Sequence, residues 1–205
     1  MADRLALFLD YQNVYKCARE AYELPTAYPS GGQVRPRALG SLIASRLPPG
    51  VTTPRELSEV RVYSGRPAQS RDHKGYGAHR AQVATWEKTG VIVVARTLSY
   101  SRGFPQEKGI DVNNAIDFVA GALDRRFDVA VLFSTDTDLI PALEFVALRT
   151  DVRVEVAKWE AHGNAPLSID GQQITCHLMD SADYWKVADA TNYVPRAKST
   201  ARPAL

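Results

Sequence analysis

The chain has 205 residues, of which 45% are hydrophobic and 23% charged, a composition typical of globular proteins. Its length predicts one domain with additions, and its formal net charge of +2 is too small to indicate nucleic-acid binding by itself. Two cysteines, with no cysteine and histidine cluster of zinc-ligand spacing, exclude a disulfide framework and a zinc finger. With neither an apolar leader nor a run long enough to cross a bilayer, we expect a soluble, cytoplasmic protein without a membrane partner.

The first strand is predicted at residues 5–9, where every side chain is apolar. Such an unbroken run is typical of a strand buried on both faces, as in a parallel sheet covered by helices. Similar runs predict strands at 59–65, 91–97, 128–134 and 151–159. Helical patterns lie between them at 37–46, 77–89, 110–125 and 138–149. This alternation predicts an α/β fold with a mainly parallel central sheet in a three-layer helix, sheet and helix sandwich.

In the helix predicted at 110–125, the apolar spacing selects one face as the stripe toward the core. The residues of that stripe are Val112, Ile116, Val119, Ala120 and Leu123. Asp111 lies at the start of this helix, and Asn114 follows one turn later on the same side.

Two segments rich in turn-forming residues, 23–37 and 160–173, are predicted to be loops. After the second loop, the sequence indicates a short edge strand and a last helix. From residue 191 the chain has three basic residues and two prolines but no apolar periodicity, which predicts disorder. The expected organisation is one domain at 1–190 and a basic tail at 191–205.

Acidic residues follow two of the predicted strands at the point where each strand ends. Asp10 comes directly after the first strand, and Asp136 and Asp138 follow the strand at 128–134. If these strands are neighbours, the three carboxylates meet Asp111 at the sheet edge where ligands bind in open α/β folds. Repulsion among four carboxylates is relieved by Mg²⁺ or Mn²⁺, because these hard cations favour oxygen ligands. The sequence therefore predicts a metal site.

Each of these residues also has a structural interpretation. Asp111 and Asp138 are suited to capping their own helices, Asp10 to a turn after its strand, and Asn13 to capping the next helix. The location of all of them at one edge of the predicted sheet favours the metal site.

Four segments occur in an order that resembles a known family: LFLDYQNVY, KGIDVNNAIDF, VLFSTDTDLIPALEFV and DSADYWKV. They resemble the NYN family, a branch of the PIN-like nucleases that includes the LabA-like proteins, over residues 4–187. The resemblance implies a PIN-like Rossmannoid sheet and a divalent-metal-dependent nuclease that acts mostly on RNA. It also implies that the catalytic, metal-binding residues are Asp10, Asp111, Asp136 and Asp138.

The resemblance extends to polar residues around these aspartates. Asn13 is implied as a supporting residue, and Asp117 matches the same family segment as Asp111. Six residues turn a helix through about 600°, so Asp117 does not share the face of Asp111 and is expected to be supporting or structural. Ser134 and Thr135 are candidates to orient water or a ligand.

The chain departs from the family pattern after the fourth strand. Family members usually have Ser-Gly-Asp-Gly-Asp-Phe there, whereas this chain has threonine at both glycine positions, Thr135 and Thr137. The loss of backbone freedom suggests an alternative, a nucleic-acid-binding or regulatory module that has lost turnover. A weaker alternative treats Asp136-Thr-Asp138 as the Asp-x-Asp of a phosphatase or sugar transferase, but it leaves Asp10 and Asp111 unexplained.

The segment 66–108 carries eight basic residues against three acidic ones. Those predicted to bind nucleic acid are Arg66, Arg71, Lys74, Arg80, Arg102 and Lys108. Aromatic residues in and next to this segment are candidates to stack on unpaired bases: Tyr63, Tyr76, Trp86, Tyr100 and Phe104. The alternative is that Trp86 packs in the core and the arginines are merely solvated. The expected protein is a ribonuclease, most simply an endoribonuclease, with single-stranded RNA as its partner and possible assembly into a homo-oligomer.

Overall fold

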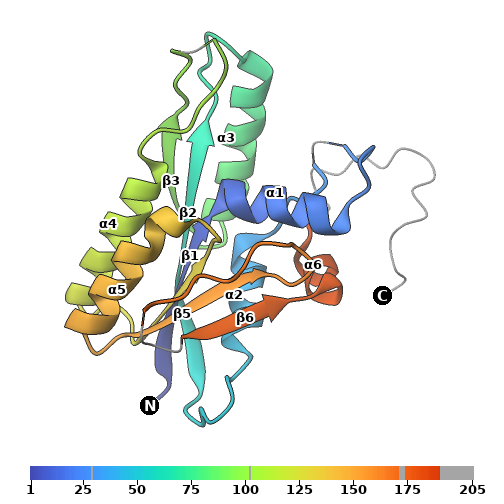
Figure 1. The fold of residues 1–205 in the computed structure, drawn as a ribbon. Coiled ribbons are helices and arrows are strands. Elements are labelled where there is room, and N and C mark those ends of the chain that lie inside the picture. Colours follow the sequence, from blue (N-terminus) through green and yellow to red (C-terminus); the bar gives the residue numbers. More distant parts are fainter. Residues whose placement is uncertain (29, 102, 171–173, 190–205) are drawn as a thin grey trace.

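The computed structural model describes residues 1–28, 30–101, 103–170 and 174–189 (Figure 1). Its strands are β1 (Asp3–Asp10), β2 (Arg55–Arg66), β3 (Ile92–Thr97), β4 (Val129–Phe133), β5 (Arg153–Trp159) and β6 (Thr175–Met179). Its helices are α1 (Tyr11–Tyr22), α2 (Pro36–Ala44), α3 (His73–Glu87), α4 (Ile110–Leu123), α5 (Ile140–Arg149) and α6 (Ser181–Val187), with a 3₁₀ turn η1 (Thr137–Leu139). The predicted tail at 191–205 lies outside the described residues.

The strands form one parallel sheet in the order β3-β2-β1-β4-β5-β6. Alternate residues of β1 face opposite layers: Leu5, Leu7 and Leu9 pack in the layer that contains α1, α2 and α6, whereas Phe8 packs under α4 and α5. Both faces of β1 are therefore buried, as its unbroken apolar run predicted. The α/β three-layer fold is confirmed.

The register of the central strands places the first and fourth strands side by side. Leu9 of β1 pairs with Phe133 of β4, and Asp10 pairs with Tyr63 of β2. The strand order reverses at β1, since the chain first builds outward to β3 and then returns to add β4 on the other side. In open α/β sheets such a switch point is where ligands bind.

Helix α1 follows β1 with no intervening residue, and sequence patterning did not predict its extent. Asp10 is its N-cap: the carboxylate accepts a hydrogen bond from the backbone N–H of Asn13 at 3.2 Å. Asn13 is therefore inside the helix, and its interpretation as the cap is wrong.

Most of the stripe predicted for α4 faces outward, whereas Val119 packs against the core and Ala120 is half-buried. Val112, Ile116 and Leu123 are each more than half exposed. The buried face contains Phe118, whose ring meets that of Phe8 edge-on at 4.9 Å. Because α4 is apolar on both faces, the spacing of its apolar residues could not decide which face meets the sheet.

Residues 66–80 and 98–109, with Arg102 not described, project past the end of the sheet; we call them the arm (Figure 1, top). The arm contains the first half of α3, a helix in which Trp86 alone is buried. The two strands of its outer loop meet at a bridge between Ser99 and Gln106. None of the helices in the described part of the chain is long and apolar enough to span a membrane.

Candidate metal centre

Three carboxylates from three different elements meet at the C-terminal edge of the sheet. Asp10 ends β1, Asp136 follows β4, and Asp111 lies in the first turn of α4. One carboxylate oxygen from each lies within 4.8 Å of the other two. The convergence predicted from the sequence is thus present for these three residues.

Ser134 connects two members of this group through its hydroxyl. Its hydroxyl donates to Asp10 Oδ2 at 2.9 Å and accepts the backbone N–H of Asp136 at 3.0 Å. The Ser134 side chain is buried, so it ties the tip of β1 to the turn after β4. Ser134 therefore contacts the carboxylate of Asp10 and the backbone of Asp136, and its role in orienting water or a ligand stays a prediction.

Burial and mutual repulsion raise the pKa values of carboxylates in the group. Burial raises the pKa of Asp10 to about 7, and the negative charges of Asp111 and Glu107 add to the rise, against hydrogen bonds from Asn13 and Ser134. Burial also raises the pKa of Asp111, with further contributions from Asp136 and Asp138. An all-oxygen donor set of this charge fits Mg²⁺ or Mn²⁺, because these ions bind oxygen in preference to nitrogen or sulfur.

Asp138 lies at the rim of the group. It is exposed, and its backbone N–H donates to Asp136 Oδ1 at 3.0 Å. Its charge still raises the pKa of Asp111. The geometry therefore gathers three of the four predicted carboxylates closely, with the fourth beside them.

The capping alternatives for two of these residues are wrong. The N-cap of α4 is Gly109, with φ +71°, and the N-cap of α5 is Leu139. Asp136, which caps η1, and Asp10, which caps α1, do combine a capping contact with a place among the carboxylates. Capping and membership of the group are therefore compatible.

Comparison with known proteins gives the family. The NYN domain model matches residues 4–184, which is most of the chain. The chain belongs to the NYN family. It is accordingly a nuclease domain of the PIN-like class, for which nucleic acid is the implied substrate.

A solved structure supports the fold. A crystal structure of a protein of unknown function, VPA0982 from Vibrio parahaemolyticus, matches with a TM-score of 0.55 and 20% sequence identity. The match covers 77% of this chain and 82% of that one. The comparison with curated proteins returned no match.

The two threonines of this NYN domain fit the backbone that they occupy. Among the described residues that are not glycine, only Arg125 has a positive φ, so neither Thr135 nor Thr137 requires a conformation reserved for glycine. The Thr135 hydroxyl accepts a hydrogen bond from Asn13 Nδ2 at 3.1 Å. The departure from the family pattern therefore places neither threonine in a positive-φ conformation.

Glu107 is a further acidic residue at the centre that sequence reasoning missed. Its carboxylate accepts the backbone N–H of Gly65 at 2.7 Å, and its charge contributes to the raised pKa of Asp10. Burial, and then Asp111, raise the pKa of Glu107 itself. Its position four residues before Asp111 was the available signal, but in the sequence Glu107 counted only as a negative charge.

Asp117 lies on another face of α4. Its Oδ2 accepts hydrogen bonds from the Tyr63 hydroxyl at 2.9 Å and from Arg61 at 3.0 Å. These contacts join α4 to β2, which is a structural role.

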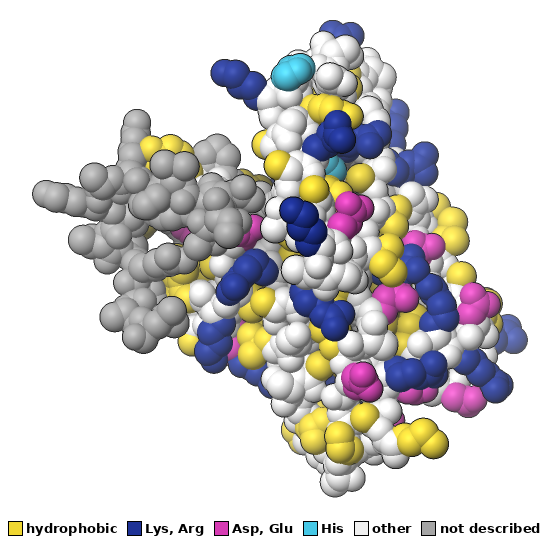
Figure 2. Space-filling model, turned by 180° about the vertical axis from the view of Figure 1, so that it is seen from behind, with side chains coloured by type: hydrophobic (Ala, Val, Ile, Leu, Met, Phe, Trp, Pro, Cys, Tyr) yellow, Lys and Arg dark blue, Asp and Glu magenta, His cyan; other side chains and the backbone are white. Residues whose placement is uncertain are grey.

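The arm carries most of the predicted nucleic-acid-binding residues. Those that are exposed are Arg71, Lys74, Arg80 and Lys108. Arg66 and Arg80 both lie over the Tyr76 ring, each 5.9 Å from its centre. Lys and Arg side chains gather on this upper part of the molecule in Figure 2. Arg102 lies outside the described residues.

The prediction that aromatic residues stack on unpaired bases is wrong for two of them. Tyr63 and Trp86 are buried, so they cannot reach a base, and Trp86 packs on Tyr11 with ring centres 4.5 Å apart. Phe104, at the tip of the arm, is 55% exposed and keeps an accessible ring.

Replacing Asp111 by Asn is expected to raise the melting temperature of the metal-free protein at pH 7. The reason is that the raised pKa reports repulsion of the Asp111 carboxylate in the folded state. The stabilisation should shrink as the pH falls toward the ordinary pKa of aspartate. Thermal unfolding in EDTA tests this, and a lower melting temperature would contradict it.

Proposed function

We propose that this NYN domain is a divalent-metal-dependent ribonuclease that hydrolyses phosphodiester bonds of single-stranded RNA. The observation that carries the proposal is the meeting of Asp10, Asp111 and Asp136 within 4.8 Å at the switch point of the sheet. In a chain of a nuclease family, such a group of oxygen donors is best explained as the centre that binds the metal.

Asp10, Asp111 and Asp136 would hold one or two Mg²⁺ or Mn²⁺ ions, with Asp138 at the rim. When bound, such an ion supplies charge stabilisation and an activated water for attack on phosphorus. Ser134 would keep the Asp10 carboxylate oriented through its 2.9 Å hydrogen bond. No side chain of the chain has to act as the nucleophile.

The arm supplies the reason for proposing RNA in single-stranded form. Among its described residues, the basic ones outnumber the acidic ones by five to two: Arg66, Arg71, Lys74, Arg80 and Lys108 against Asp72 and Glu107. Exposed cations therefore dominate its outer surface and suit a phosphate backbone, whereas Phe104 offers a ring to an unpaired base. Lys108 is the basic residue nearest in sequence to the carboxylates.

The test is cleavage of end-labelled single-stranded RNA by the purified protein in Mn²⁺, Mg²⁺ or EDTA. Metal-dependent cleavage that is lost in Asp10→Asn is the expected result. Asp151→Asn, which removes an exposed carboxylate at the opposite edge of the sheet, is the matched control and should retain activity. Parallel substrates of single-stranded DNA and duplex RNA test the proposed preference.

Other outcomes distinguish the alternatives. Binding of RNA without cleavage in any metal would indicate the inactive nucleic-acid-binding module. The φ angles of Thr135 and Thr137 are not positive, which weakens one argument for that alternative. Hydrolysis of a small phosphomonoester that depends on Asp136, without cleavage of RNA, would instead favour the Asp-x-Asp phosphatase, which family membership does not support.

A further inference from the structure

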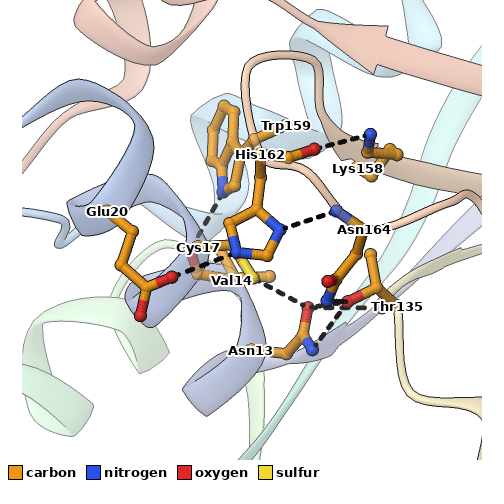
Figure 3. A network of polar contacts seen from close by, with 9 residues as sticks. All are labelled: Asn13, Val14, Cys17, Glu20, Thr135, Lys158, Trp159, His162 and Asn164. Atoms are coloured by element: carbon orange, nitrogen blue, oxygen red, sulfur yellow. Dashed lines mark hydrogen bonds and ion pairs between the residues drawn. The ribbon is translucent and has the colours of Figure 1, made fainter.

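Thr135 stands between two residues of the metal centre, Ser134 and Asp136. Its side chain contacts Asn13 of α1 and Asn164, which lies in the segment after β5 (Figure 3). Thr135 therefore connects the turn that carries Asp136 with two other elements of the fold. One of these, the segment after β5, was predicted only as a loop.

The Thr135 hydroxyl accepts hydrogen bonds from two asparagine side chains. It accepts from Asn13 Nδ2 at 3.1 Å and from Asn164 Nδ2 at 3.0 Å, and it donates to Asn13 Oδ1 at 3.4 Å. A hydroxyl can accept two hydrogen bonds, so the two amide groups occupy both acceptor positions. The backbone N–H of Thr135 also donates to Asn13 Oδ1, at 3.2 Å.

Asn164 is exposed, yet the segment that carries it is fastened to α1. The ring of His162 bridges Glu20 Oε2 at 3.1 Å and the backbone N–H of Asn164 at 3.5 Å (Figure 3). Because that N–H can only donate, His162 Nδ1 is the acceptor and Nε2 carries the proton toward Glu20. The buried Lys158 ammonium donates to the His162 carbonyl at 2.9 Å, which fixes the turn itself.

We infer that Asn164 and Thr135 are positioning residues of the metal centre: together they fix the turn that presents Asp136 to Asp10 and Asp111. The inference rests on the proposed function, because it assigns these residues to the same centre. Neither residue contacts the carboxylate group directly. Each acts through the backbone between Ser134 and Asp136, and Asn164 brings the segment after β5 into the site.

The first measurement is Mn²⁺ binding by isothermal titration calorimetry, which does not depend on catalysis. Thr135→Val keeps the shape of the side chain but removes the hydroxyl, and Asn164→Ala removes its partner. Each variant is expected to weaken Mn²⁺ binding about three- to tenfold, the loss typical of one or two hydrogen bonds. The double variant should bind no more weakly than Thr135→Val, because both changes break the same contact.

Two further variants separate positioning from stability. Thr135→Ser restores the hydroxyl and is expected to restore Mn²⁺ affinity. Ser168→Ala alters an exposed residue of the same segment and should bind Mn²⁺ as the wild type does. In cleavage assays at subsaturating Mn²⁺, Asn164→Ala should lower kcat and leave the KM for RNA unchanged.

The results separate the inference from the proposed function. If the wild type binds Mn²⁺ and both single variants bind it equally well, the inference is overturned even if their melting temperatures fall, and the proposed function stands. If losses in the two variants are additive, the shared contact is not their cause and the inference fails. If the wild type itself neither binds Mn²⁺ nor cleaves RNA, both fall.

Discussion

Asp10→Asn is expected to abolish metal-dependent cleavage and, in the same protein, to raise the melting temperature when the metal is chelated. Removal of groups that only support metal ligands typically costs 10- to 100-fold, so loss of a ligand should cost at least about 100-fold. The carboxylate has a pKa of about 7 in the folded protein against 3.8 ordinarily, so at pH 8 its ionisation costs about 4 kcal/mol of folding stability. Asn is uncharged and retains an acceptor for the N–H of Asn13.

The sign of the pH dependence follows from the raised pKa of Asp10. A carboxyl that binds its proton more tightly when folded favours the folded state at low pH, and that contribution is lost between about pH 4 and 7. The variant should therefore melt on the order of 10 °C above the wild type at pH 8 in EDTA, and near it at pH 4. Saturating Mn²⁺ should reverse the order at pH 8, because only the wild type gains binding energy. A variant that melts lower than the wild type in EDTA at pH 8 would show that capping of α1 outweighs charge repulsion.

Removal of two cations from the arm, in Arg71→Ala/Lys74→Ala, is expected to raise the KM for RNA about tenfold at low salt and to leave kcat unchanged. Both side chains are exposed on the arm. The slope of log affinity against log salt should fall by about 1.4, since each phosphate contact to a single strand contributes about 0.7. Fluorescence anisotropy with labelled RNA over a salt series measures that slope.

The matched control removes the same charge elsewhere. Arg37→Ala/Arg149→Ala changes residues of α2 and α5, outside the arm, and should leave the slope and the KM unchanged. Equal effects from both double variants would show that the protein attracts RNA through its net charge, without a defined binding surface.

The architecture was predictable because each buried strand carried its own signal. The unbroken apolar run of β1 predicted burial on both faces, and the acidic residues after β1 and β4 predicted the edge at which they meet. What made convergence certain was the strand order, since Leu9 pairs with Phe133 in neighbouring strands. From the sequence alone, convergence could be predicted only on the condition that these two strands are neighbours.

The remaining features depend on tertiary contacts that leave little trace in the sequence. The face of α4 that is buried was decided by the rings of Phe8 and Phe127, which Phe118 and its neighbours cover. Glu107 and Asn164 lie in segments without periodicity, and they meet their partners Gly65 and Thr135 only because the fold brings these loops together. The role of such residues can be recognised only when their contacts with residues far apart in the sequence are known.

The contrast between a packed sheet and a thinly packed arm divides the molecule into parts with different resistance to opening. Asp10 ends β1, and the turn that carries Asp136 follows β4. These two central strands should exchange their amide hydrogens only on global unfolding. In α3, Trp86 alone is buried, so the arm should open at a much lower cost. Warming should therefore lower the affinity for RNA at temperatures well below those that unfold the carboxylate centre. Substrate affinity and metal affinity should then have separate temperature limits.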